Sequence, residues 1–109
     1  MLSLEELKNK YSEEQLYRVP MTIEGEDFNE VKLEFVFKKP KAGHVDRLLK
    51  EISTKPSLAM KNYLLTLVVA EHREALEKAM EEYPMIHTQL TDKLNGLAGG
   101  NAVADLKKL

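Results

Sequence analysis

The chain has 109 residues, a formal net charge of -2 and 43% hydrophobic residues. This is enough apolar material for one small domain with a single modest core, and too little chain for a second domain. With no cysteine in the sequence, disulfides, thiolate chemistry and cysteine-ligated zinc are excluded. Because both charge signs are interspersed, no broad basic face is available to nucleic acid, and we expect none as a partner.

The sequence gives no support for secretion or membrane insertion. Its N-terminal segment is acidic and lacks the basic region and the apolar stretch of a secretion signal. The longest apolar run, residues 64–70, is interrupted by Thr66 and is too short to cross a bilayer. We therefore expect a cytoplasmic protein with no membrane partner.

The first element expected is a short helix with a well-specified start. Ser3 is placed to cap its N-terminus, and Glu6 three residues later completes a capping box. Leu2 and Leu7 are spaced as a hydrophobic staple across this cap. The pattern predicts that the helix ends near Tyr11.

A β-hairpin is predicted next, because two segments show apolar residues with a period of two. These residues are Tyr17, Val19, Met21 and Ile23 in the first segment, and Val31, Leu33, Phe35 and Phe37 in the second. Turn residues lie between them, and folding about Asp27 pairs Ile23 with Val31 and Tyr17 with Phe37 on one apolar face. Pro20 makes the first strand an edge strand. Helices must cover the apolar face, since a lone hairpin is marginal in water.

After Pro40 the hydrophobic rhythm becomes helical. The expected helices run over residues 43–53, 58–70, 71–83 and 86–97. The second is nearly apolar all round and is predicted to be the buried centre of the body. Pro84 ends the third helix, and Gly99-Gly100 ends the last. The expected fold class is α+β, an N-terminal β-hairpin packed on a bundle of three to four α-helices.

This interpretation divides the chain into a single compact domain, residues 1–100, and a flexible C-terminal tail, residues 101–109. The tail is a short amphipathic stretch with Val103 and Leu106, and it would bury little on its own. Residues 96–100 are rich in glycine but follow a helix, whereas a phosphate-binding loop precedes one. We interpret them as a helix stop with a flexible joint.

No catalytic or metal-binding pattern stands out. The histidines His44, His72 and His87 lack metal-ligand spacing, and we expect each to be an ordinary surface or boundary residue. Five glutamates at helical spacing have cations among them, which favours a solvated, salt-bridged face. They are Glu71, Glu74, Glu77, Glu81 and Glu82, with Arg73 and Lys78 between them. We therefore expect a protein that is not an enzyme and carries no cofactor and no metal.

A small basic cluster surrounds Pro40. Lys38, Lys39 and Lys41 could hold phosphate or an acidic partner, although three lysines at a strand exit are usually only solvated.

Several segments together resemble a known family. They are residues 35–40, residues 45–50, residues 62–69, and the sequence from Leu76 through Glu82-Tyr83-Pro84, Leu90 and Leu94 to residues 96–99. Over residues 30–100 the chain resembles the tail assembly chaperones of bacteriophages and prophages. The resemblance implies a small protein of the host bacterial cytoplasm that is absent from the finished virion. Such a protein binds the long helical tape-measure protein before the tail tube polymerises around it.

A chaperone of this kind needs apolar surface that accepts amphipathic helices. Candidate partner-binding residues follow two helical stripes: Leu76, Met80, Ile86, Leu90, Leu94 and Leu97. Met80 and Met85 would add the adaptable surface that helix binding favours. The alternative that stays open here is that the two stripes pack on each other inside the domain.

Two other functional classes also stay open. One is a small helical adaptor or regulatory module that binds a host or phage protein through the same stripes. The other is an enzyme subunit that contributes carboxylates to a shared site, which predicts a concave pocket lined by converging glutamates. We also expect self-association, through the unpaired edge of the second strand or through the last helix.

The resemblance further implies a longer second product, made when ribosomes slip near the end of the reading frame. Residues 101–109 could carry such an extension without strain on the core. We expect this tail to be mobile in the isolated protein, its deletion to leave the melting temperature nearly unchanged, and an overlapping second frame to lie downstream.

Overall fold

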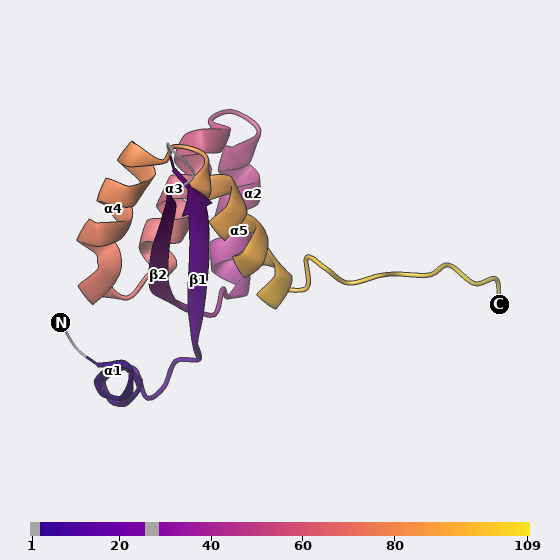
Figure 1. Cartoon of the computed structure of the whole chain (residues 1–109). Coiled ribbons are helices and arrows are strands. Elements are labelled where there is room, and N and C mark those ends of the chain that lie inside the picture. Colours follow the sequence, from indigo (N-terminus) through magenta and orange to yellow (C-terminus); the bar gives the residue numbers. More distant parts are fainter. Residues whose placement is uncertain (1–2, 26–28) are drawn as a thin grey trace.

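The computed structural model describes residues 3–25 and 29–109. The elements in chain order are α1 (Leu4–Lys10), β1 (Leu16–Glu24), β2 (Glu30–Lys38), α2 (Ala42–Ile52), α3 (Pro56–Leu67), the short 3-10 helix η2 (Ala70–His72), α4 (Arg73–Glu82) and α5 (Ile86–Leu97). Figure 1 shows the hairpin lying across the helices α2–α5, with α1 beside the end of the hairpin where β1 begins. The predicted fold class is confirmed.

The start of α1 follows the sequence signal. The Glu6 N–H donates to the Ser3 hydroxyl at 3.2 Å, so Ser3 caps the helix as predicted. The helix ends at Lys10, with Tyr11 as its C-cap. The staple partner Leu2 lies outside the described residues.

The register of the hairpin is confirmed residue by residue. Tyr17 lies opposite Phe37 and Ile23 opposite Val31, with the intervening pairs in step. All these side chains fall on one face, because successive residues of a strand point to opposite sides of the sheet. The centre of the predicted turn, Asp27, lies outside the described residues.

The main core lies between this face and the helical body. Phe37, Leu64, Leu67, Leu76 and Leu94 are all fully buried. They come from β2, α3, α4 and α5, so the helix predicted to be central, α3, does contribute to the middle of the core. The rings of Phe35 and Phe37 add an edge-to-face contact at 6.5 Å.

The central helix is shorter than predicted. It was expected to reach residue 70, but α3 ends at Leu67, and both Val68 and Val69 are extended. The Val69 N–H donates to the Val36 carbonyl at 3.0 Å, and Val68 forms a bridge with Phe37. These β-branched residues therefore form an extended two-residue segment beside β2, joined to it by an isolated bridge and one backbone hydrogen bond, where the contact with the sheet replaces a continuation of the helix.

Both outer edges of the hairpin are interrupted. The Lys39 N–H bonds to the Gln15 carbonyl and the Gly25 N–H to the Asn29 carbonyl, so the cross-strand hydrogen bonds join odd-numbered residues. The backbone N–H and C=O groups of the even-numbered residues therefore point away from the partner strand, toward the outer edges. Pro20 occupies one of these outward positions on β1 and has no N–H to offer, as expected for an edge strand. On β2 both backbone groups of Val36 are already bonded. Self-association through the β2 edge stays a prediction, but that edge is covered at Val36.

Two histidines are buried, contrary to the expectation of surface or boundary residues. His72 is 8% exposed and its Nδ1 accepts the Val36 N–H at 3.0 Å, which requires an unprotonated nitrogen at that position. His87 is equally buried, and its Nδ1–H donates to the Pro84 carbonyl. Each ring bonds a backbone group that has no partner in a helix or in the hairpin ladder: the Val36 N–H at the edge of β2 and the Pro84 carbonyl before α5. The sequence pattern does not reveal that these groups need a side-chain partner.

A second, smaller hydrophobic cluster lies on the opposite face of the sheet. Leu7, Val36 and Val69 are buried together there, with Tyr11 and Leu16 packed against them. By the alternation of β2, Val36 lies on the face opposite Phe35 and Phe37. That face is not exposed at this end, because α1 and the Val69 segment cover it. This cluster was not predicted.

A polar tether accompanies the cluster. Glu71 accepts hydrogen bonds from Lys10 Nζ at 2.6 Å and from the Tyr11 hydroxyl at 2.8 Å. The Tyr11 oxygen in turn accepts the Ala70 N–H at 3.3 Å. The bonds from Lys10 and then Tyr11 lower the pKa of the Glu71 carboxyl to about 2, because they stabilise its charged form. Glu71 thus joins α1 to the start of η2 and does not belong to a continuous acidic face.

The last helix ends in a defined hydrogen-bonded cap. The Gly100 N–H donates to the Asn95 carbonyl at 2.7 Å and the Gly99 N–H to the Gly96 carbonyl at 3.2 Å, which is the bonding of a Schellman motif. Gly99 adopts a φ of 93°, a conformation that favours glycine. The joint expected to be flexible is therefore a specific turn in this structure. Beyond it, residues 102–109 have no regular secondary structure and extend away from α5 (Figure 1).

Candidate partner-binding grooves

The six residues predicted to bind a partner lie in the core. Five are buried: Leu76, Met80, Ile86, Leu90 and Leu94. Leu97 is half-buried and packs against the same core. The structure thus agrees with the alternative that the two stripes pack inside the domain, and it corrects the expectation that they line an exposed surface. A helical stripe of apolar residues indicates that the stripe will be covered, but it does not show whether the same domain or a partner protein covers it.

An open apolar groove lies where the tip of β1 meets the corner between α4 and α5. We call it the Met85 groove. Its walls are Met21, Thr22 and Ile23 from β1, and Glu82, Tyr83, Pro84, Met85, Ile86 and Gln89 from the corner. Its volume is about 390 Å³. The Met85 side chain is 71% exposed and places an adaptable thioether at the rim of the groove.

The corner that presents Met85 is held by backbone hydrogen bonds. Tyr83 leaves the helical conformation and its N–H still bonds to the Ala79 carbonyl at 2.8 Å. The Ile86 N–H then returns to the Tyr83 carbonyl at 3.1 Å, while His87 bonds to Pro84. Pro84 cannot continue α4, so the chain must turn here. Met85 is consequently presented by a tight, bonded corner.

A second groove lies beside the N-terminus of α2 and the end of α5. We call it the Leu49 groove. It is lined by Pro40, Lys41, Ala42, Gly43, Val45, Asp46, Leu49 and Ala98, and has a volume of about 730 Å³. Leu49 is 64% exposed, although its spacing from Val45 and Ile52 is typical of one apolar face of a helix. Lys41 is the member of the basic cluster around Pro40 that borders this groove. Its backbone N–H donates to Nδ1 of His44 at 3.0 Å.

A third groove separates α1 from the start of β1. Its volume is about 630 Å³, and Leu4, Leu7, Leu16, Tyr17 and Val36 supply its apolar walls. Lys8, Glu14 and Arg18 border it with charges of both signs.

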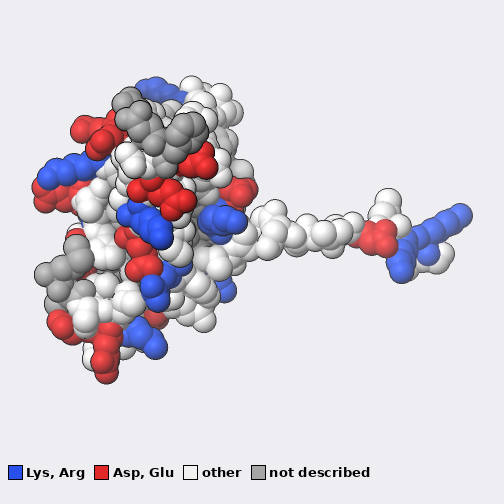
Figure 2. Space-filling model, in the orientation of Figure 1, with Lys and Arg blue, Asp and Glu red and all other residues white. Residues whose placement is uncertain are grey.

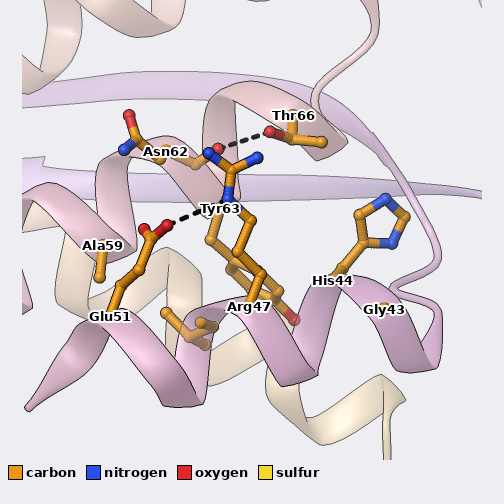
Figure 3. A pocket seen from close by; sticks show the side chains of 9 residues that line it. Gly43, His44, Arg47, Glu51, Ala59, Asn62, Tyr63 and Thr66 are labelled. Atoms are coloured by element: carbon orange, nitrogen blue, oxygen red, sulfur yellow. Dashed lines mark hydrogen bonds and ion pairs between the residues drawn. The ribbon is translucent and has the colours of Figure 1, made fainter.

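A smaller cleft of about 220 Å³ lies between α2 and α3. Figure 3 shows Arg47 reaching from α2 across this cleft, with its Nε bonded to Glu51 at 3.1 Å. On the other wall the Thr66 hydroxyl donates to the Asn62 carbonyl at 2.8 Å (Figure 3). Most polar groups here are thus paired with neighbours, and none forms the nucleophile and base pair that acyl-transfer chemistry needs.

Tyr63 forms part of the floor of this cleft. Its hydroxyl is buried and has no hydrogen-bond partner among the described residues. Burial raises the pKa of Tyr63 to about 12, because the phenolate would lose its solvation. The Thr91 hydroxyl on α5 is the other buried side-chain group without a partner in the described part of the chain. The raised pKa keeps the Tyr63 hydroxyl in its neutral form at physiological pH.

The carboxylates expected on a shared face are mostly in ion pairs. Glu74 lies 3.3 Å from Lys78 and Glu77 lies 3.9 Å from Arg73, both at helical spacing. The salt-bridged interpretation is confirmed for these two. Each of the four grooves above has at most one glutamate in its walls, so none of them shows the converging carboxylates that an enzyme subunit would need. No group of three metal-ligating side chains is found within residues 3–25 and 29–109.

The surface charge is mixed. On the face shown in Figure 2, Lys and Arg alternate with Asp and Glu over the body, and the tail is uncharged until near its end. The face shown has no extended field of one sign that would attract a polyanion. Among the described helices, none has the length and hydrophobicity to cross a bilayer.

Comparison with known proteins identifies a family but no function. A family described as "Domain of unknown function (DUF6848)" matches residues 7–107 of this chain. A solved structure, "Structure of uncharacterised protein rbstp2171 from bacillus stearothermophilus", is 33% identical, covers 96% of this chain and 100% of its own, and has a TM-score of 0.79. No curated protein matches the chain.

Proposed function

We propose that this chain, which belongs to the DUF6848 family, is a non-enzymatic tail assembly chaperone that binds the helical tape-measure protein during tail morphogenesis. The proposal rests on the resemblance of residues 30–100 to phage and prophage tail assembly chaperones. Its place of action is the cytoplasm of the host bacterium, before the tail tube is assembled.

The observation that supports the proposal most directly is where the resembling residues lie. Glu82, Tyr83 and Pro84 are part of the resemblance, and all three line the Met85 groove. The buried stripes of α4 and α5 cannot accept a client while the domain is folded. The Met85 groove is open, apolar and next to those stripes, so in this proposal it replaces them as the client site.

The chemistry of the groove suits an amphipathic helix. Such a helix docks by inserting side chains spaced three or four residues apart into an apolar groove. Met21 and Met85 offer unbranched, flexible side chains that adjust to different partners, and Ile23 adds aliphatic surface. Glu82 and Gln89 provide a polar rim that can meet the polar face of the helix. A client with many similar helical segments needs this tolerance.

The proposal is tested by binding to segments of the tape-measure protein, whose sequence the genome supplies. A reading frame downstream should encode a long helical protein, and a second frame should overlap the end of the one that encodes this chain. Overlapping fragments of that protein should co-purify with this chain.

Two substitutions locate the binding site. Met85→Asp should weaken fragment binding at least about tenfold, because one well-buried apolar side chain contributes roughly 1.5–3 kcal/mol. The matched control is Leu58→Asp, at a residue that is 50% exposed on α3 and outside the Met85 groove. Equal binding by the wild type and both variants would exclude this groove. Binding of an unrelated host protein in place of the fragments would favour the alternative, a small adaptor module.

A further inference from the structure

The C-terminal tail carries exposed apolar side chains that the monomer does not cover. Val103 and Leu106 are 97% and 96% exposed, and Leu109 is fully exposed. The three residues are spaced three apart, which places them on one side of a segment with about three residues per turn. A short stretch with this pattern is suited to lie in an apolar groove.

The direction in which the tail leaves the body is fixed by its two glycines. A Cβ atom at Gly100 would lie 2.7 Å from the Asn95 carbonyl oxygen, so only glycine fits there without a shift. The Ala102 N–H adds a further bond to the Gly99 carbonyl at 3.0 Å. This bonded turn directs residues 102–109 away from their own domain (Figure 1).

The Leu49 groove lies next to the root of the tail. Ala98, the C-cap of α5, is one of its walls, and the exposed Leu49 is another. Lys41 and Asp46 border the groove with one charge of each sign. The tail carries both signs too, with Asp105 and then Lys107 beyond its apolar start (Figure 2).

We propose that two copies of this chain exchange tails, so that residues 102–109 of each copy lie in the Leu49 groove of the other. A two-fold axis near Ala98 allows both exchanges at once, because the donor segment and the acceptor groove start from the same place on each copy. The dimer buries Leu49 and the apolar side of the tail, which are the exposed apolar features around the end of α5.

A second copy fits the observations better than the chain's own groove. To reach its own groove, the tail would have to reverse at the point where the Schellman motif directs it outward. A second copy also brings an identical tail, so the exchange covers Leu49 and the apolar side of the tail on both chains. The dimer requires nothing from the proposed chaperone function.

The first experiment measures the mass of the full chain by light scattering across a concentration series. The wild type should rise to twice the monomer mass, and Leu106→Asp in the tail and Leu49→Asp in the groove should each remain at the monomer mass. Leu58→Asp, equally charged but elsewhere on the surface, should still dimerise. Because all three sites are exposed, circular dichroism should show the same fold and melting temperature for the three variants at dilute concentration.

The second experiment tests the contact itself and exploits the absence of native cysteine. A mixture of Leu49→Cys and Leu106→Cys proteins should form a disulfide-linked heterodimer under mild oxidation, and a mixture of Leu58→Cys with Leu106→Cys should not. The doubly substituted chain should give a covalent dimer held by reciprocal disulfides. A monomeric chain closed by an internal disulfide would show that the tail folds back on its own groove and would overturn the proposal. A wild type that stays monomeric up to millimolar concentration would overturn it equally.

Failure of this proposal is distinguishable from failure of the chaperone function, since every readout uses the isolated protein without any client.

Discussion

The two faces of the β-hairpin are covered in different ways. The face with Phe35 and Phe37 packs against the helical body through the main hydrophobic core. The opposite face is covered only at one end, by α1 and the Val69 segment, through a small cluster around Leu7 and a polar tether from α1 to Glu71. The first face can hold the whole fold together, whereas the second holds a single helix in place. The predictions below test this difference in order of expected effect.

The largest effect is expected from Phe35→Ala. The side chain is 3% exposed in the main core, so its removal should lower the free energy of unfolding by about 3–5 kcal/mol. Thermal and denaturant melts measure this loss. The control is Thr22→Ala, at an exposed position of β1, which should change little. A Phe35→Ala melt that coincides with the wild type would show that this face is not the core.

Leu7→Ala should have a smaller and more local effect. Its side chain is buried in the small cluster, and the loss should be about 2–3 kcal/mol, at the low end for a buried leucine. Hydrogen exchange should speed up in α1 while the hairpin and α3 remain protected. Leu4→Ala, on the same helix but 41% exposed, is the matched control. If Leu7→Ala opened the whole domain as Phe35→Ala does, the two faces would not differ as we describe.

The tether predicts a pH dependence. The pKa of Glu71 is about 2 in the folded protein against an ordinary 4.5, so its contribution to stability is fully present above about pH 4.5. That contribution should be lost as the pH falls from about 4.5 to about 2, when the carboxyl becomes protonated in both states. Glu71→Gln should flatten this part of the stability profile, and Glu74→Gln, in an exposed pair of α4, serves as control. Identical acid profiles for the wild type and Glu71→Gln would contradict the tether.

The smallest effect is expected from deletion of residues 101–109. These residues are exposed throughout, so at concentrations where the protein is monomeric the melting temperature should stay nearly unchanged. With rising concentration the wild type should gain stability through dimerisation, and the truncated chain should not. Unfolding of the truncated domain in dilute solution would show that the tail is part of the core structure.

How well the sequence predicts this fold depends on how local the signal is. The hairpin register could be predicted because alternation along each strand fixes which residues share a face, and the turn residues between the strands then select the pairing of Ile23 with Val31 and of Tyr17 with Phe37. The end of α3 could not, because residues 68 and 69 are as apolar as the helix before them. What stops the helix is a hydrogen bond to Val36, which lies more than thirty positions earlier in the chain.

The candidate site was harder to predict for a related reason. An amphipathic stripe shows that a face will be covered, but not whether the chain itself or a partner covers it. The domain covers Leu90 and Leu94, which are four residues apart on α5. Leu49 follows Val45 on α2 at the same spacing, yet its side chain is exposed. The corner at Pro84 was readable as a helix break, yet the groove beside it also needs Met21 and Ile23 from the hairpin. Only the tertiary structure brings these together.

The tether of α1 also bears on the order in which the protein can be made. Tyr11 and its partner Glu71 are separated by 60 residues, so α1 leaves the ribosome long before its docking site exists. At roughly 5–20 residues per second this interval lasts about 3–12 s. A helix of seven residues is not stable alone in water, and during that time the N-terminal segment is an unfolded, accessible chain. The N-terminal helix is thus the first element to be synthesised but docks late, and its docking requires that the chain has been made at least as far as Glu71.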